Sequence, residues 1–156
     1  MRRRRHEPPI RRTSSGIEVA LPHWVTSLVT AAVRQLRREV DAPGSVAAQR
    51  LLAPLDESAS ADDPIVTLMR QHALDEVFDV VEASAQRTVL TDAEAEAWLE
   101  ATGLVLAART AQLGVRTEED RRAVSRRDEA FLQVVYAVQL GLIEALDAPP
   151  PGDPNG

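Results

Sequence analysis

The chain has 156 residues, of which 44% are hydrophobic and 27% are charged, enough for one globular domain with its own core. It contains no cysteine, which excludes disulfides, thiolate zinc sites and thiol nucleophiles. The net charge of −6 is uneven, because residues 1–12 hold six arginines and one glutamate while residues 13–156 hold twelve arginines and 23 acids. An acidic body repels phosphate, so any nucleic-acid role would fall to the basic N-terminal residues.

All 18 cationic side chains apart from histidine are arginines, which excludes Schiff-base catalysis and a phosphate-loop lysine. Only three histidines occur, and neither a glycine-rich phosphate loop nor a nucleophile elbow is present. The sequence therefore predicts a protein that is not an enzyme, with no catalytic residues and no cofactor.

The partly apolar stretch after Arg12 contains Glu18, Pro22 and His23, so it lacks the continuous apolar core of a secretion signal. No uninterrupted run reaches the about 18 apolar residues of a membrane helix. We therefore expect a cytoplasmic protein without membrane association.

The sequence predicts a basic disordered tail over residues 1–15, a single helical domain over 16–148, and a disordered tail rich in proline and glycine over 149–156. Apolar and polar residues alternate from Ile17 to Leu21, which is typical of a short strand. This strand can pair with residues 10–13 across Ser14-Ser15-Gly16 to form a β-ribbon that must lie against helices.

The first helix is predicted over residues 22–40, where proline suits the first position and one face is apolar. Pro43-Gly44 ends it, and a short helix over 46–52 and a loop over 53–61 follow. The next helical stretch has its apolar residues on two nearly opposite faces: Ile65, Leu68 and Met69, then Leu74, Val77, Phe78 and Val81. A straight helix cannot bury both sets against one neighbour, which predicts a kink or break between Arg70 and Ala73, with helices of about 64–70 and 73–86.

Thr91 and Glu94 form a capping-box sequence that opens a helix ending near Gly114, and Thr117 can begin a short helical turn. The last helix, residues 128–146, is apolar over more than half of its circumference in two rows. One row contains Val135, Val138 and Leu142, and the other contains Tyr136, Leu140 and Ile143. We therefore predict an all-α fold: an irregular bundle of roughly five or six helices around a central C-terminal helix.

Residues 88–114, together with the last helix, carry a family resemblance. Its features are Asp92-Ala-Glu94, Trp98-Leu99, Leu113-Gly114 and Thr117-Glu-Glu119. In these features the chain resembles an actinobacterial family of helical proteins of unknown function. Genes of that family often lie near the gene for the adaptor that delivers N-degron substrates to the Clp protease, and some members are labelled transcriptional regulators. The resemblance implies a helical fold and a link to Clp proteolysis, and it implies no established activity.

Four side chains form a weak metal candidate: His72, Asp75, Glu76 and Asp79. On a helix, imidazole and carboxylate groups spaced by three and four residues converge. Asp75 and Glu76 would also suit the first turn after the predicted break, because acids favour the positive end of a helix. No second helix offers a matching pair of ligands, so the sequence favours the structural interpretation and no metal.

Two side chains are candidates for binding an anion or a protein partner. Arg109 falls within the apolar stripe of its helix, where it can bind an anion. Alternatively it is structural and either extends its charge to water at the end of the stripe or pairs with an acid of a neighbouring helix; the sequence favours a structural role. Trp24 stands at the margin of an apolar face and can belong equally to the core or to an interface. Trp98 is assigned to the core.

The nucleic-acid candidates are Arg2, Arg3, Arg4, Arg5, Arg11 and Arg12. They can neutralise phosphates, but no aromatic residues lie between them for base stacking. We therefore predict first a non-enzymatic cytoplasmic adaptor or regulatory protein that acts through protein–protein contacts, alone or as a homodimer. The alternatives are a nucleic-acid-associated transcriptional regulator that uses these arginines and a metal-dependent enzyme with its site near His72.

Overall fold

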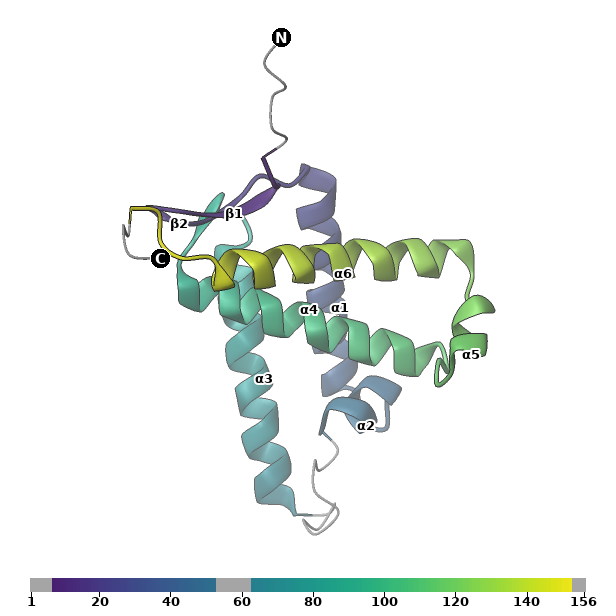
Figure 1. The fold of residues 1–156 in the computed structure, drawn as a ribbon. Helices are drawn as coiled ribbons and strands as arrows, with labels where there is room; N and C mark the ends of the chain where they lie inside the picture. The colour runs from purple at the N-terminus through teal and green to yellow at the C-terminus, as the bar shows by residue number, and fades with distance from the viewer. Residues whose placement is uncertain (1–6, 53–62, 153–156) are drawn as a thin grey trace.

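The structure, a computed structural model, describes residues 7–52 and 63–152 (Figure 1). The elements in chain order are β1 (Ile10–Thr13), β2 (Gly16–Val19), α1 (His23–Asp41), α2 (Val46–Leu52), α3 (Pro64–Ser84), β3 (Val89–Leu90), α4 (Asp92–Gln112), α5 (Glu118–Arg122) and α6 (Arg126–Asp147). The predicted fold class is confirmed: an all-α bundle with a small antiparallel sheet near the N-terminus. The predicted loop over residues 53–61 lies outside the described residues.

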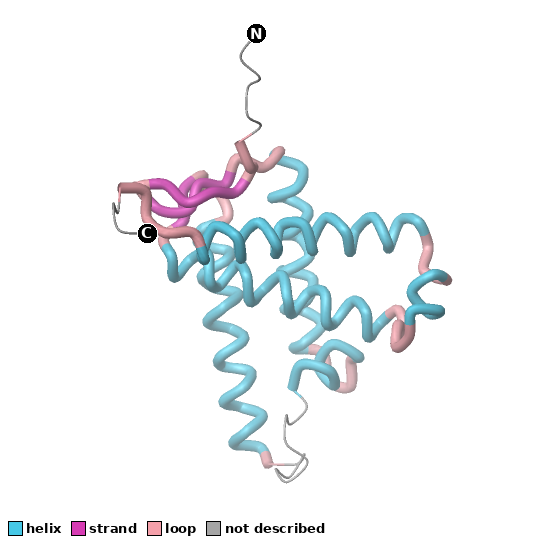
Figure 2. The backbone as a smooth tube through the Cα atoms, viewed as in Figure 1, coloured by secondary structure: helices cyan, strands magenta, loops and turns pink. Residues whose placement is uncertain are grey.

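The helix at the centre of the bundle is α4. It contacts α1, α2, α3 and α6 as well as β2 and β3, and Figure 2 shows α4 and α6 lying side by side across α1 and α3. Small side chains make this close approach feasible, because Ala95, Ala97, Ala101 and Ala108 are all buried along α4. Alanine-rich faces let several neighbouring backbones pack on one helix, which is why α4 occupies the middle.

The C-terminal helix is not the central one, which corrects the prediction. The first apolar row of α6 is buried through Val135, Val138 and Leu142, and α6 packs against α4 and β1. The second row is buried only at its first residue, Leu132, and is exposed from Tyr136 onward, where Tyr136 keeps 58% of its surface accessible. The prediction assumed that every apolar row must be covered, whereas folded proteins expose a large apolar area on their surfaces.

The N-terminal ribbon is confirmed, and it extends to a third strand. β1 pairs with β2, with Ile10 opposite Val19 and Thr13 opposite Gly16, so Gly16 belongs to the strand and the turn is shorter than predicted; β2 pairs in turn with β3. Residues 10–15 therefore belong to the fold and not to a tail as their basic composition predicted. The physical reason is Ile10, which is buried and packs closely over Gly141 of α6.

Helix α3 runs without a break, so the predicted interruption between Arg70 and Ala73 is wrong. Phe78 and Val81, in its C-terminal half, are buried. The other apolar set needs no second neighbour, because it remains exposed at the N-terminal end of the helix. Pro64 occupies the first turn and the Asp63 side chain accepts a hydrogen bond from the backbone N–H of Ile65, which explains why the helix begins there.

Local signals at the other helix ends are confirmed. Both reciprocal hydrogen bonds of the Thr91–Glu94 capping box form, and Gly114 adopts a left-handed φ of 69° just after α4. A second capping box, between Thr117 and Asp120, opens α5. Gly114 and the Thr117–Asp120 box define the turn that reverses the chain between α4 and α6.

Candidate functional site

An open apolar groove lies between α1 and α6, with the C-terminal half of α4 as its floor. Its volume is about 870 Å³. The apolar side chains that line it come from all three helices: Trp24, Leu28, Ala31, Ala32, Leu36, Val105, Ala108, Ala130, Phe131 and Val134. Several of these are alanines, so the facing helices leave space that larger side chains would have filled.

Trp24 stands in the wall of this groove with 60% of its surface exposed. Its neighbours along α1 are Leu28 and Ala31, spaced four and seven residues further on, so the three lie on one face. The sequence indicated a single apolar face on this helix and did not separate this second stripe from it. The structure therefore places Trp24 on a surface and not in the core.

Arg109 lines the same groove, so the structure brings the two partner candidates of the sequence together. Its Nη2 donates a hydrogen bond to Asp128 Oδ1 at 2.6 Å, and its Cζ lies 5.9 Å from the centroid of the Phe131 ring. The pairing of Arg109 with an acid of a neighbouring helix is thus confirmed. The side chain nevertheless stays 41% exposed, which leaves the guanidinium accessible from the groove.

Asp128 is held by two partners at the start of α6. The Ser125 hydroxyl donates to its Oδ2 at 2.7 Å, and Arg109 donates to its other oxygen. These hydrogen bonds, that of Ser125 first, lower the pKa of Asp128 below its usual value. The carboxylate therefore stays charged and ties α4 to the first turn of α6 at one end of the groove.

Two cations and two acids line the groove: Arg109 and Arg127, and Glu39 and Asp128. Glu39 accepts a hydrogen bond from Gln112 at 2.6 Å and another from Gln35 at 2.8 Å, so its oxygens are occupied. Arg127 also lines the groove, and it forms no hydrogen bond or ion pair with another described residue. The formal charges of the lining therefore cancel, and the charge of Arg127 also helps to lower the pKa of Asp128.

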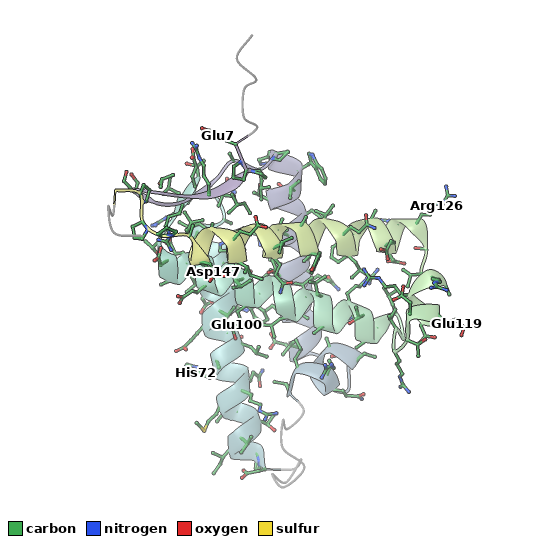
Figure 3. The ribbon with its side chains drawn as sticks, in the orientation of Figure 1. Glu7, His72, Glu100, Glu119, Arg126 and Asp147 are labelled. Atoms are coloured by element: carbon green, nitrogen blue, oxygen red, sulfur yellow. The ribbon has the colours of Figure 1, made fainter. Side chains whose placement is uncertain are left out.

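The metal candidates do not converge. Asp75 and Asp79 point to Arg37 of α1, at 3.7 and 2.8 Å, and the Arg37 pKa is raised, mainly by the hydrogen bond to Asp79. His72 and Glu76 form an exposed pair at 3.4 Å, and Figure 3 shows His72 pointing outward from α3. Across the described part of the chain no three metal-ligating side chains of the His, Cys, Asp or Glu type lie together.

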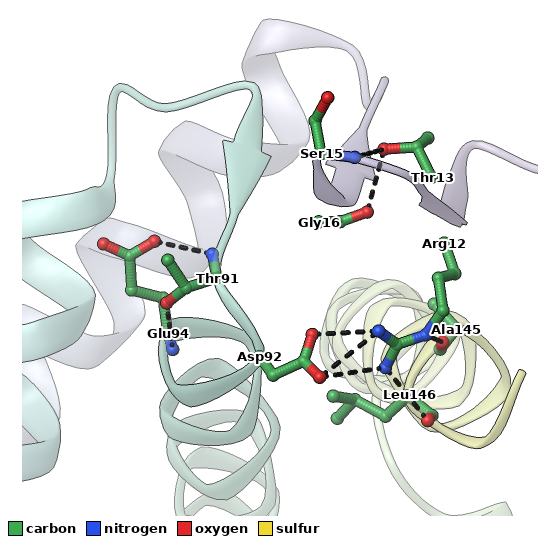
Figure 4. A network of polar contacts seen from close by, with 9 residues as sticks. All are labelled: Arg12, Thr13, Ser15, Gly16, Thr91, Asp92, Glu94, Ala145 and Leu146. Atoms are coloured by element: carbon green, nitrogen blue, oxygen red, sulfur yellow. Dashed lines mark hydrogen bonds and ion pairs between the residues drawn. The ribbon is translucent and has the colours of Figure 1, made fainter. Parts of the chain in front are cut away.

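Two of the nucleic-acid candidates are engaged in the fold. Arg11 pairs with Glu7 and Glu18, both at 2.6 Å. Arg12 donates from Nη1 to Asp92 at 3.0 Å and from Nε and Nη2 to the last carbonyl groups of α6 (Figure 4). The guanidinium therefore interacts favourably with the carboxylate at the start of α4 and with the negative C-terminal end of the α6 dipole. Arg2, Arg3, Arg4 and Arg5 lie outside the described residues.

Trp98 lies in the core as predicted, and a buried hydrogen bond accompanies it. Its indole Nε1–H donates to Ser84 Oγ at 2.9 Å, and both residues are almost fully buried. Ser84 was not singled out from the sequence, because a serine near a helix end carries no signal of a distant partner. The contact joins the end of α3 to α4 and serves the fold, not the groove.

Helix α6 is long and apolar enough to cross a membrane by length and composition alone, with a mean hydropathy of 1.4 over 18 residues. The sequence predicted no such segment, because it contains no uninterrupted apolar run of that length. A helix that packs into its own fold passes the same test, and α6 packs on α4 and β1. Its exposed row, on the side away from the groove, consists of Tyr136, Leu140 and Ile143.

Comparison of the chain with protein-family models, with curated proteins and with solved structures finds no match. The groove is therefore the feature that indicates a function.

Proposed function

We propose that this protein is a non-enzymatic adaptor or regulatory module that binds a protein segment in the groove between α1 and α6. The observation that carries the proposal is the groove itself, an apolar depression with the exposed Trp24 in its wall. Contiguous exposed apolar surface bounded by polar groups is typical of interaction sites, and tryptophan is enriched among residues that dominate binding energy.

The shape of the groove favours a helical ligand. The lining residues of α1 extend from Trp24 to Glu39, which corresponds to about 22 Å of helix. Two helix walls and a helix floor are the surroundings that an amphipathic helix meets when it docks through apolar residues three and four positions apart. A segment of about four turns would fill the length of the groove.

The nucleic-acid alternative has less support, because Arg11 and Arg12 already have acidic partners. It would depend on Arg2 to Arg5, about which the structure says nothing. The link to Clp proteolysis rests on the family resemblance, and the cytoplasmic location rests on composition. Both stay predictions.

Affinity capture from the native host tests the proposal, with the Clp components monitored. The bait is the wild-type chain, compared with Ala31→Arg, which places a long cation in the groove from an exposed position of α1. Ala83→Arg is the matched control, since Ala83 is an exposed alanine of α3 that does not line the groove. We expect at least one protein to be enriched by the wild type and the control and lost with Ala31→Arg.

Circular dichroism spectra of the three baits must agree, which separates lost binding from lost folding. Equal capture by Ala31→Arg and the wild type would place binding elsewhere and refute the groove as the docking surface.

A further inference from the structure

The outer row of α6 is an apolar surface that no other described part of the chain covers. We define the outer row as Tyr136, Leu140 and Ile143, which are 58%, 42% and 38% exposed. Their spacing of four and three residues places them on one stripe of the helix. The same spacing continues to Gln133 on one side and to Asp147 on the other. A repeat of three and four residues along a helix is the pattern through which two helices pack side by side.

Opposite charges stand at the two ends of this stripe. Arg126 opens α6, and Glu144 and Asp147 lie in its last turn; Figure 3 shows Arg126 and Asp147 at opposite ends of the helix. None of the three side chains forms a hydrogen bond or an ion pair with another described residue. The helix dipole disfavours a cation at its start and acids at its end, so α6 itself gains nothing from this arrangement. These charges are therefore available to a partner.

The surroundings of the first end are basic. A depression of about 380 Å³ lies between α5 and the first half of α6, and its charged lining consists of Arg121, Arg122, Arg126, Glu118 and Glu129. Arg121 pairs with Glu129 at 3.7 Å, which leaves Arg122 and Arg126 against Glu118 alone. The lining thus carries one net positive charge, and the depression offers room beside α6 for the end of another helix.

The surroundings of the second end are acidic. Arg12 lies there, but its Nη1 already pairs with Asp92 at 3.0 Å and its other donors bind the last carbonyl groups of α6. The charge of Arg12 is therefore balanced by Asp92. Glu144 and Asp147 then leave two uncompensated negative charges at this end of α6.

Antiparallel packing of two α6 helices brings unlike ends together. A twofold axis near the middle of the outer row places Arg126 of one copy beside Asp147 of the other, and it does so twice. The same arrangement sets Tyr136 against the partner's Leu140 on both sides of the axis. Parallel packing would instead place like charges side by side at both ends. The stripe is therefore complementary to itself in the antiparallel direction only.

We propose that α6 pairs antiparallel with α6 of a second copy of this chain through the outer row. The helix has 22 residues and is about 33 Å long. Only its middle is apolar, so the contact is smaller than that of a permanent dimer and the association is weak. The outer row lies on the side of α6 away from the groove, so the dimer leaves both grooves accessible. Two grooves in one dimer bind a partner that carries two matching segments more tightly than one groove does.

Sedimentation equilibrium of the full chain tests the pairing. We expect a dimer dissociation constant on the order of 10–100 μM, in keeping with a small interface. Leu140→Arg places a cation in the middle of the outer row and should raise this constant about tenfold or more. Leu68→Arg is the matched control, because Leu68 is 67% exposed on α3, outside the outer row, and it should leave the constant unchanged.

A wild-type chain that stays monomeric at about 500 μM would overturn the proposal and leave the outer row to a different protein or to a lipid surface. Equal weakening by Leu140→Arg and Leu68→Arg would overturn it as well. Ala31→Arg should leave the dimer unchanged, because Ala31 lines the groove. A dimer lost with Ala31→Arg would place the interface in the groove and not on the outer row.

Charge reversal tests the antiparallel direction. Arg126→Glu and Asp147→Arg should each raise the dissociation constant about fivefold, and the double variant should restore it to within about twofold. Both changes suit the helix dipole, so the melting temperature of the dilute protein should not fall, which separates association from folding. Arg50→Glu on α2 makes the same charge change away from α6 and should have no effect. A double variant as weak as the single variants would contradict the antiparallel pairing.

The absence of cysteine allows a direct test of the register. The proposed axis sets Gln133 opposite the partner's Ile143, so a mixture of Gln133→Cys and Ile143→Cys chains should form mixed disulfide dimers on oxidation. We expect about fivefold more of them than when Ala83→Cys, an exposed position of α3, replaces Ile143→Cys. Mass spectrometry of the linked peptides identifies the dimers. Linkage mainly between identical chains would mean parallel packing, and equal yields in both mixtures would mean no specific contact; either result would overturn the proposal.

Discussion

The hydrogen bond between Trp98 and Ser84 makes a strong prediction about stability. Ser84→Ala removes the acceptor of an indole N–H that lies 2.9 Å from it, with Ser84 1% and Trp98 5% exposed. At this burial water cannot easily replace the hydroxyl. An unpaired buried donor costs about 1–3 kcal/mol, so we expect the free energy of unfolding to fall by about 2 kcal/mol.

For a two-state domain of this size that loss lowers the melting temperature by about 4–8 °C. Denaturant titration followed by tryptophan fluorescence measures the loss directly. Ser14→Ala is the control, because Ser14 is an exposed serine of the β1–β2 turn, and it should change stability by less than about 0.5 kcal/mol.

A double-mutant cycle isolates the hydrogen bond itself. Trp98→Phe removes the donor, so the further loss from Ser84→Ala in that background should be clearly smaller than in the wild type. If the two losses simply add, or if Ser84→Ala alone leaves stability unchanged, the hydrogen bond does not hold α3 to α4 and the reasoning fails.

Three further predictions concern the sheet, the N-terminal arginine and the groove. Gly16→Ala should lower the melting temperature, because Gly16 has a φ of 131° and an added Cβ would overlap the carbonyl oxygen of Leu90; an unchanged temperature in a calorimetric scan would contradict this. Arg12→Met keeps the length of the side chain but loses its contacts to α4 and α6, so amide exchange in β1 should accelerate, whereas unaltered protection would show that Arg12 is not a clamp. The lowered pKa of Asp128 stabilises the fold above the unfolded value of about 3.9, and this contribution disappears as the pH falls through the lower folded value. Asp128→Asn should therefore flatten the acid limb of the stability–pH curve, and a curve parallel to that of the wild type would refute the assignment.

Local features of the sequence were sufficient to place most helices and their ends. The Thr91–Glu94 capping box and the left-handed Gly114 bound α4 where the sequence predicted, and the β-ribbon formed between the expected segments with a turn one residue shorter. Such signals act between residues close in the chain, through caps, backbone dihedral angles and alternation. Their predictions therefore do not depend on how distant parts of the chain pack.

Burial and proximity were decided only by the tertiary structure. The apolar pattern of α6 did not reveal which row faces α4, and the two faces of α3 suggested a break because both were assumed to be buried. Likewise, nothing local joined Trp24 to Arg109 in one groove, since they lie on different helices. Helix propensity and caps specify where each helix begins and ends, but the side chains that become covered depend on how helices far apart in the chain pack together. In this protein the buried alanines of α4 allow its neighbours to approach closely, whereas the groove and the outer row of α6 stay open.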